Sequence, residues 1–235
     1  MNTKGKLFLI PSPLGEYDPA EVLPVPVLER ARALKCFVVE ELRTARRFLS
    51  AAGLKGHIEE LEFHTLNEHT PQQEEEALAG LFDRGDVGLI SEAGLPAVAD
   101  PGASLVALCH RKGIEVVPLT GPSSLMLALM ASGLNGQSFA FRGYLPAKTE
   151  ERKSAIKEVE RLSKALNQSQ LFIETPYRND SLMADMLKTL QPATRLTVAA
   201  DLTLPTAFIS TRSVAEWRRS PVEIGKRPCV FIILA

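Results

Sequence analysis

Three loops in the sequence combine glycine, proline and small polar residues in a way that suits ligand binding. They are Pro11–Gly15, Ser91–Gly102 and Thr120–Ser124, and each follows a short apolar run. Glycine lets backbone amides and carbonyls approach a flat ligand closely, and proline presets the shape of a loop. The three loops together therefore predict a binding site. The alternative is a set of tight turns that hold no ligand.

The absence of three common motifs narrows the class of ligand that the loops could bind. It contains no G-x-x-x-x-G-K-[ST], which argues against a P-loop nucleoside triphosphatase, and no G-x-G-x-x-G, which argues against a dinucleotide site of the NAD type. It also contains no G-x-S-x-G, so Ser91, Ser123 and Ser124 lack the setting of a hydrolase nucleophile. A ligand with adenine and ribose but no pyrophosphate suits these loops better than a dinucleotide.

Short apolar runs alternate with segments of helical periodicity and must position the loops. The expected strands are Leu7–Ile10, Cys36–Val39, Val87–Ile90, Glu115–Leu119, Leu171–Ile173, Leu196–Ala200 and Val230–Leu234. The expected helices are Pro71–Asp83, Gly102–Arg111, Pro122–Ser132, Thr149–Leu166 and Asn179–Leu190. This alternation predicts an α/β fold with largely buried strands, in which ligands bind beyond the carboxyl ends of the strands.

The distribution of charge predicts two lobes. Residues 1–140 carry 12 basic and 18 acidic side chains, whereas residues 141–235 carry 15 basic and 10 acidic ones. Glycine and proline punctuate the segment 136–148, where the balance changes. We expect an amino-terminal α/β lobe over 1–140 that holds the binding loops, and a carboxy-terminal α/β lobe over 145–235 with a basic surface. The alternative is that both charged faces are solvated and bind nothing.

Composition excludes several classes of protein. Hydrophobic residues make up 45% of the chain and charged residues 23%, which is typical of a globular domain. The longest purely apolar run, Leu125–Ala131, is far shorter than the ~20 residues of a membrane-spanning helix. We expect a cytoplasmic protein that binds no membrane. The isolated cysteines Cys36, Cys109 and Cys229, and histidines without zinc-binding spacing, lead us to expect no metal site.

Several segments resemble motifs of a known family, in the same order along the chain. They read PSPLG from Pro11, SEAGLPAVADPG from Ser91, PLTGPS from Pro118, GYLPAK from Gly143 and FIETPYR from Phe172, and an H-x-x-N-E element recurs as His64, Asn67 and Glu68. These segments resemble the tetrapyrrole methylase family, also called class III S-adenosylmethionine-dependent methyltransferases. The likeness is strongest to its small-subunit ribosomal RNA methyltransferase I branch, and it spans residues 7–235.

The resemblance implies a fold, an activity and a set of binding residues. It implies two α/β lobes with S-adenosylmethionine in the cleft between them, usually in a homodimer. It also implies methylation of a cytidine ribose 2′-hydroxyl, with the small ribosomal subunit or its RNA as acceptor. The donor-binding residues that it implies are Leu14, Gly15, Ala93, Gly94, Leu95, Val98, Ser123 and Ser124, with Tyr177 as a candidate from the second lobe.

The chemistry of methyl transfer and of RNA binding indicates candidate residues for two further roles, a general base and contacts to phosphate. Methyl transfer from a sulfonium needs no metal, but a ribose hydroxyl is a weak nucleophile that benefits from a hydrogen-bonded base. The candidate bases are the carboxylates Glu40, Glu92, Asp100 and Glu174, each of which could instead cap a helix or pair with an arginine. The candidate contacts to RNA phosphates are Arg142, Lys148, Arg152, Lys153 and Arg178.

The sequence departs from the branch where polar groups would face the substrate. E-D-T-R is replaced by Glu40–Arg43 (EELR), and Leu95 stands where the branch has threonine in S-D-A-G-T-P. Where the branch has A-R-E-L-T-K, this chain has Ala199–Leu204 (AADLTL). Where the branch has G-E before the last strand, this chain has Arg227-Pro228. Two other functions therefore stay open: methylation of a small molecule of the tetrapyrrole type, and donor binding without catalysis.

Overall fold

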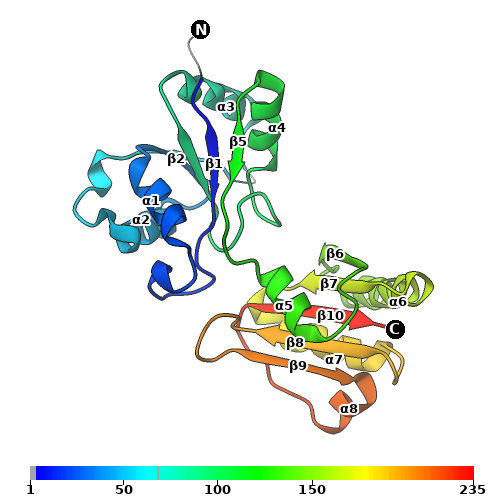
Figure 1. Cartoon of the computed structure of the whole chain (residues 1–235). Coiled ribbons are helices and arrows are strands. Elements are labelled where there is room, and N and C mark those ends of the chain that lie inside the picture. The colour runs from blue at the N-terminus through cyan, green and yellow to red at the C-terminus, as the bar shows by residue number, and fades with distance from the viewer. Residues whose placement is uncertain (1–3, 68) are drawn as a thin grey trace. The chain divides into compact units, whose positions relative to one another are not determined.

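A computed structural model describes residues 4–67 and 69–235 (Figure 1). The chain divides between Ser123 and Ser124 into two compact units, which we call the first and the second unit. Each unit has its own five-stranded sheet. Within the described residues, no helix combines the length and the apolar character that crossing a membrane requires.

The sheet of the first unit is entirely parallel. Its strands are β1 (Leu7–Ile10), β2 (Cys36–Val39), β3 (Glu62–Thr65), β4 (Val87–Ile90) and β5 (Val116–Pro118), in the order β3-β2-β4-β1-β5. Successive strand residues belong to different cores, since Phe37 packs in one hydrophobic cluster and its neighbour Val38 in the other. Because both faces are covered, β1, β2 and β4 read as nearly continuous apolar runs, and their prediction is confirmed.

Helices cover both faces of this sheet. They are α1 (Val25–Ala33), α2 (Leu42–Leu49), α3 (Gln72–Ala77) and α4 (Ala103–Lys112), and Figure 1 shows α1 and α2 on the face opposite to α3 and α4. A π-helical turn, Ser50–Leu54, extends α2. The helix predicted over 71–83 is an α-helix only to Ala77 and continues as a 3-10 helix, Leu78–Asp83.

The sheet of the second unit is mixed. Its strands are β6 (Phe139–Tyr144), β7 (Ser169–Ile173), β8 (Arg195–Ala200), β9 (Phe208–Ser213) and β10 (Cys229–Leu234), in the order β6-β7-β10-β8-β9. Only β6 and β7 pair in parallel. The helices α6 (Thr149–Leu166), α7 (Asn179–Thr189) and α8 (Val214–Arg219) supply Ile156, Met186 and Trp217 to one core with the sheet.

Helix α5 (Ser124–Ser132) belongs to the second unit. It packs against β8, β9 and β10, and the Thr211 hydroxyl donates to the Ser132 carbonyl oxygen at 2.7 Å. The boundary that we expected within 136–148 therefore lies too late in the chain. The charge balance and the turn residues change within 136–148, but they reflect only the surface of the protein. The boundary lies before α5, because the apolar residues of α5 are buried against the second sheet.

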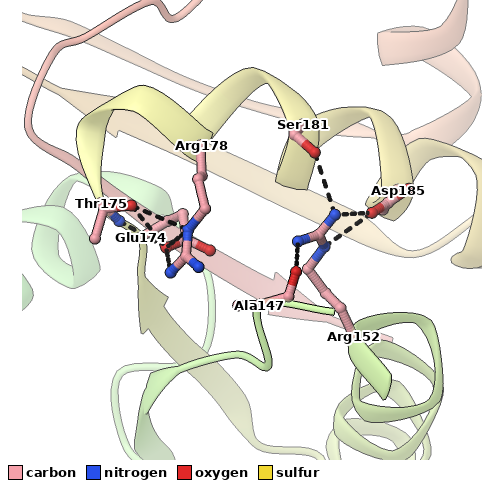
Figure 2. A network of polar contacts seen from close by, with 7 residues as sticks. All are labelled: Ala147, Arg152, Glu174, Thr175, Arg178, Ser181 and Asp185. Carbon is pink, nitrogen blue, oxygen red and sulfur yellow. Dashed lines mark hydrogen bonds and ion pairs between the residues drawn. The ribbon is translucent and has the colours of Figure 1, made fainter. Parts of the chain in front are cut away.

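The second unit also contains a buried ion pair between two helices. Arg152 of α6 is buried, and its guanidinium donates through Nε to Asp185 Oδ2 of α7 at 2.8 Å. The remaining nitrogens donate to the Ala147 carbonyl oxygen and to the Ser181 hydroxyl at 2.9 and 3.1 Å (Figure 2). The guanidinium therefore joins α6, α7 and the loop before α6 at one point.

We predict that Gly88→Ala lowers the free energy of unfolding by about 1–3 kcal/mol through overpacking. A Cβ on Gly88 of the central strand β4 would lie 2.7 Å from Ile10 Cδ1 and 2.8 Å from Phe37 Cδ1. Urea denaturation measures the change. Gly80→Ala is the control, because no atom of the described residues lies within 4 Å of its Cβ position. Equal midpoints for the two variants would contradict the prediction.

We predict that Arg152→Ala destabilises the protein by about 3–5 kcal/mol, because it leaves the Asp185 carboxylate buried without its partner. Denaturation of purified protein measures this loss. Lys153→Ala is the matched control, since the ion pair of Lys153 with Glu150 lies at the surface, and we expect little change. A stable Arg152→Ala variant would show that the pair does not hold α6 to α7.

Candidate functional site

A hollow of about 430 Å³ lies beyond the carboxyl ends of the strands of the first unit. It is lined by the loop after β1, by one side of α2 and by the loop after β4. The lining residues are Ser12, Pro13, Leu14, Gly15, Glu16, Tyr17, Pro19, Thr44, Arg47, Phe48, Ala51, Glu92 and Ala93. Its volume is within the roughly 300–1,000 Å³ of small-molecule sites. The hollow thus lies at the edge of the sheet where we expected a ligand to bind.

The three predicted loops pack against one another. Ser12 and Gly94 exchange backbone hydrogen bonds of 2.9 and 3.1 Å, and the Ser12 hydroxyl donates to the Ser91 carbonyl oxygen at 3.2 Å. Gly94 has a φ of +79°, and a Cβ there would lie 3.2 Å from Leu14 Cδ2. A Cβ on Gly121 would lie 2.2 Å from Pro11 Cβ, so the third loop presses against the first. Glycine at these two positions allows the close approach.

Some of the predicted donor-binding residues line the hollow, and the others lie in the adjoining loops or in the second unit. Leu14, Gly15 and Ala93 line the hollow. Gly94, Leu95 and Val98 belong to the same loop as Ala93, and Ser123 ends the first unit. Ser124 and Tyr177 belong to the second unit, where Tyr177 is 74% exposed. The roles of all these residues stay predictions.

One side of α2 contributes lining residues that the sequence analysis missed. Thr44, Arg47, Phe48 and Ala51 come from α2 and the turn after it. We did not predict α2, because its arginines hide the short apolar stripe of Ala45, Phe48 and Leu49 that the helix buries. The signal that could have found it is Glu41, whose carboxylate caps the helix by accepting from Thr44 N at 2.6 Å.

Three of the four candidate carboxylates interact in the first unit. Glu40 Oε2 accepts from the backbone N–H of Glu92 at 3.0 Å. Asp100 is partly buried, and its pKa is raised to about 6, first by burial and next by the negative charge of Glu40. Glu92 raises this pKa further, while the Ser91 hydroxyl lowers it. Asp100 is therefore a stronger base than an ordinary carboxylate and is still largely ionised at neutral pH.

The fourth candidate carboxylate, Glu174, lies in the second unit and forms an ion pair. Its Oε1 accepts from Thr175 N at 2.7 Å and from Arg178 Nη2 at 2.6 Å (Figure 2). Its side chain is fully buried, and its Oε2 has no hydrogen-bond partner within the described residues. Arg178, an expected RNA contact, is thus committed to Glu174.

The other basic candidates divide into exposed and buried residues. Arg142, on edge strand β6, donates to Gln170 Oε1 at 2.6 Å. Lys148 and Lys153 form ion pairs within α6 and its first turn, with Glu151 at 3.1 Å and Glu150 at 2.8 Å. The expectation that Arg152 contacts RNA is wrong, because Arg152 lies on the buried face of α6 and donates inside the unit. Glu68 of the H-x-x-N-E element lies outside the described residues.

Comparisons with known proteins agree with the motifs. The sequence model of the Tetrapyrrole (Corrin/Porphyrin) Methylases matches residues 20–216. Ribosomal RNA small subunit methyltransferase I of Escherichia coli O157:H7 is 31% identical over 236 residues, which cover 99% of this chain and 78% of that protein. Its namesake from Vibrio cholerae serotype O1 is 31% identical over 211 residues, which cover 89% of this chain and 69% of that protein.

Solved structures share the fold. The methyltransferase CobJ has a TM-score of 0.65 and 14% identity, and the match covers 98% of this chain and 94% of that one. Uroporphyrin-III C-methyl transferase from Thermus thermophilus, solved with S-adenyl homocysteine, has a TM-score of 0.61 and 16% identity, covering 98% and 97%. The expected α/β fold class is confirmed. With the family model matched over most of its length, the chain belongs to the tetrapyrrole methylase family of S-adenosylmethionine-dependent methyltransferases.

Proposed function

We propose that this protein transfers a methyl group to a ribose 2′-hydroxyl of small-subunit ribosomal RNA. The observation that carries the proposal is the group of Glu40, Glu92 and Asp100. Glu92 lines the hollow, Asp100 belongs to the same loop after β4, and Glu40 accepts from the backbone N–H of Glu92. A base thus belongs to a loop that lines a hollow within the size range of small-molecule sites. The names of the relatives, which match this chain over most of its length, support ribosomal RNA as the acceptor.

The hollow suits S-adenosylmethionine. Leu14, Gly15 and Ala93 would hold the donor, and the carboxylate of Glu92, which also lines the hollow, favours a positively charged sulfonium. The charge of Glu16, another lining residue, is neutralised by its ion pair with Arg47. The rings of Tyr17 and Phe48 offer flat apolar surface for an adenine. When bound, the donor supplies an electrophilic methyl group. Gly94, Leu95, Val98 and Ser123 are proposed to shape the site from the adjoining loops.

Asp100 is the proposed base. Its carboxylate would accept the proton of the ribose hydroxyl as the oxygen forms its bond to the methyl carbon. The carbon–sulfur bond of the donor would break in the same displacement, and S-adenosylhomocysteine would leave with the electron pair. The negative charges of Glu40 and Glu92 raise the proton affinity of Asp100, so the two residues act as positioning and tuning groups. Glu174 is less suited to this role, because its side chain is buried and already accepts from Arg178.

The acceptor would contact exposed cations. Arg142, Lys148 and Lys153 are the remaining candidates in the second unit, and their present partners form contacts at or near the surface. Exposed ion pairs contribute little free energy, so a phosphate can replace the acidic partner. We also propose a homodimer, supported by the exposed apolar side chains Met126 and Met130 on α5, which are 44% and 76% exposed.

A second candidate is methylation of a small, flat molecule of the tetrapyrrole type. Leu42 and Val98 follow β2 and β4, and they are 38% and 45% exposed. Apolar side chains at these loops would suit an apolar ring system better than a ribose and its phosphates.

Transfer of a tritiated methyl group to small ribosomal subunits tests the function. The subunits come from cells that lack this protein, and label in an alkali-resistant dinucleotide is expected, because a 2′-O-methyl group blocks cleavage. Ala93→Trp should fill the hollow and abolish both donor binding and transfer, whereas Ala33→Trp, on a different surface, should change neither. Donor binding without any transfer to the subunits would move the assignment to the small-molecule acceptor.

We predict that the rate of transfer rises with pH through an acid limb near 6, because Asp100 must lose its proton to act as the base. Asp100→Asn should lower kcat by about 10²–10⁴-fold and leave donor affinity unchanged. Glu40→Gln removes a negative charge that raises the pKa of Asp100, so the limb should move to lower pH. A limb that stays in place in Glu40→Gln would exclude Asp100 as the group that titrates.

A further inference from the structure

The amino ends of β2 and β3 bring together three side chains that ligate metals. Cys36 is paired in register with Glu62, and Val38 is paired with His64, so Cys36, Glu62 and His64 project from one face of the sheet. A sulfur, a carboxylate oxygen and an imidazole nitrogen of these residues lie within 4.8 Å of one another. Cys36 starts β2, whereas Glu40 and the hollow described above lie beyond its other end. This cluster is therefore separate from the proposed catalytic group.

We propose that Cys36, Glu62 and His64 form a binding site for a divalent metal ion of the zinc type. Thiolate sulfur, imidazole nitrogen and carboxylate oxygen are the three ligand classes that zinc takes from proteins. His64 Nε2 is already 2.8 Å from Glu62 Oε1, so the two donors need only small shifts to share one ion. Three protein ligands leave one tetrahedral position for water.

The surroundings provide a path for the ion. A second hollow, of about 370 Å³, is lined by Cys36 and Glu62 and opens on the side away from the carboxyl-end loops. His64 and Glu62 are partly exposed, and Cys36 is partly buried. An ion can therefore reach the sulfur from solvent without opening the core.

Charged neighbours show what the ion must displace. Arg84 donates to Glu62 Oε1 at 2.7 Å, and its side chain is 60% exposed. Arg30, Lys35 and Asp86 also line this hollow. In the metal-free protein the Arg84 guanidinium neutralises Glu62. It competes with the ion and can turn into solvent when the ion binds.

The ion would fasten an edge strand. Among the strands that the structure describes, β3 pairs with β2 alone, and its sequence, EFHT, is largely polar. An ion held by Cys36 of β2 and by Glu62 and His64 of β3 would link the two strands by coordination as well as by backbone hydrogen bonds. The bound ion thus stabilises the pairing of β3 with β2 at the edge of the sheet and takes no part in methyl transfer.

Cobalt(II) is the probe, because a thiolate ligand gives it a near-ultraviolet charge-transfer band. We expect the full chain, stripped of metal with a chelator, to develop this band with one equivalent of cobalt and to lose it on addition of zinc. Cys36→Ser should abolish the band. His64→Gln should weaken cobalt binding by at least about 100-fold, more than the loss of an outer-sphere partner costs.

Matched variants separate this site from the other cysteines and histidines of the chain. Cys109→Ser and His57→Gln should keep the band, because neither residue belongs to the cluster. Arg84→Ala should bind cobalt more tightly, since it removes the competing cation. Absence of a thiolate band in the wild type at millimolar cobalt, or a band that survives Cys36→Ser, would overturn the proposal. Because His64 is partly exposed, His64→Gln remains a test if Cys36→Ser does not fold.

Discussion

Parallel pairing is the constraint on which the first unit depends. Because every strand pair of its sheet is parallel, all carboxyl ends meet at one edge, and every connection must cross a face of the sheet. The first consequence is that loops distant in sequence converge, as Ser12 and Gly94 do through their reciprocal hydrogen bonds. The second is that both faces are buried, so a central residue such as Gly88 has no room for a Cβ. The hollow and its carboxylates follow from this geometry.

Burial changes the chemistry of ionisable groups differently in the two units. Asp100 is partly buried beside other carboxylates, so it gains proton affinity. Arg152 and Asp185 are buried against each other and satisfy one another, so they hold helices together. Glu174 lies between these cases, with one oxygen paired to Arg178 and the other without a partner within the described residues. The same residue types thus gain proton affinity or form a structural pair according to what packs beside them.

The loops at the carboxyl edge of the first sheet keep some residues of the related branch and replace others. Leu14, Gly15 and Ala93 belong to segments that resemble family motifs, and all three line the hollow. In contrast, Leu42 and Leu95 stand where the related branch has threonine, and their side chains cannot donate a hydrogen bond to a substrate.

The sequence by itself determined the apolar strands, most of the helices and the glycine- and proline-rich loops, because these depend on local periodicity and turn chemistry. It did not reveal the helices α1, α2 and α8 or the strands β3, β6 and β9. The arginines of α2 obscure its buried stripe, and β3 is an edge strand that needs no apolar alternation. Only the tertiary structure decided that Arg152 faces inward, that Glu40 and Glu92 act on Asp100, and that Cys36 meets Glu62 and His64. These relations depend on strand register and helix packing between distant segments, which sequence spacing does not encode.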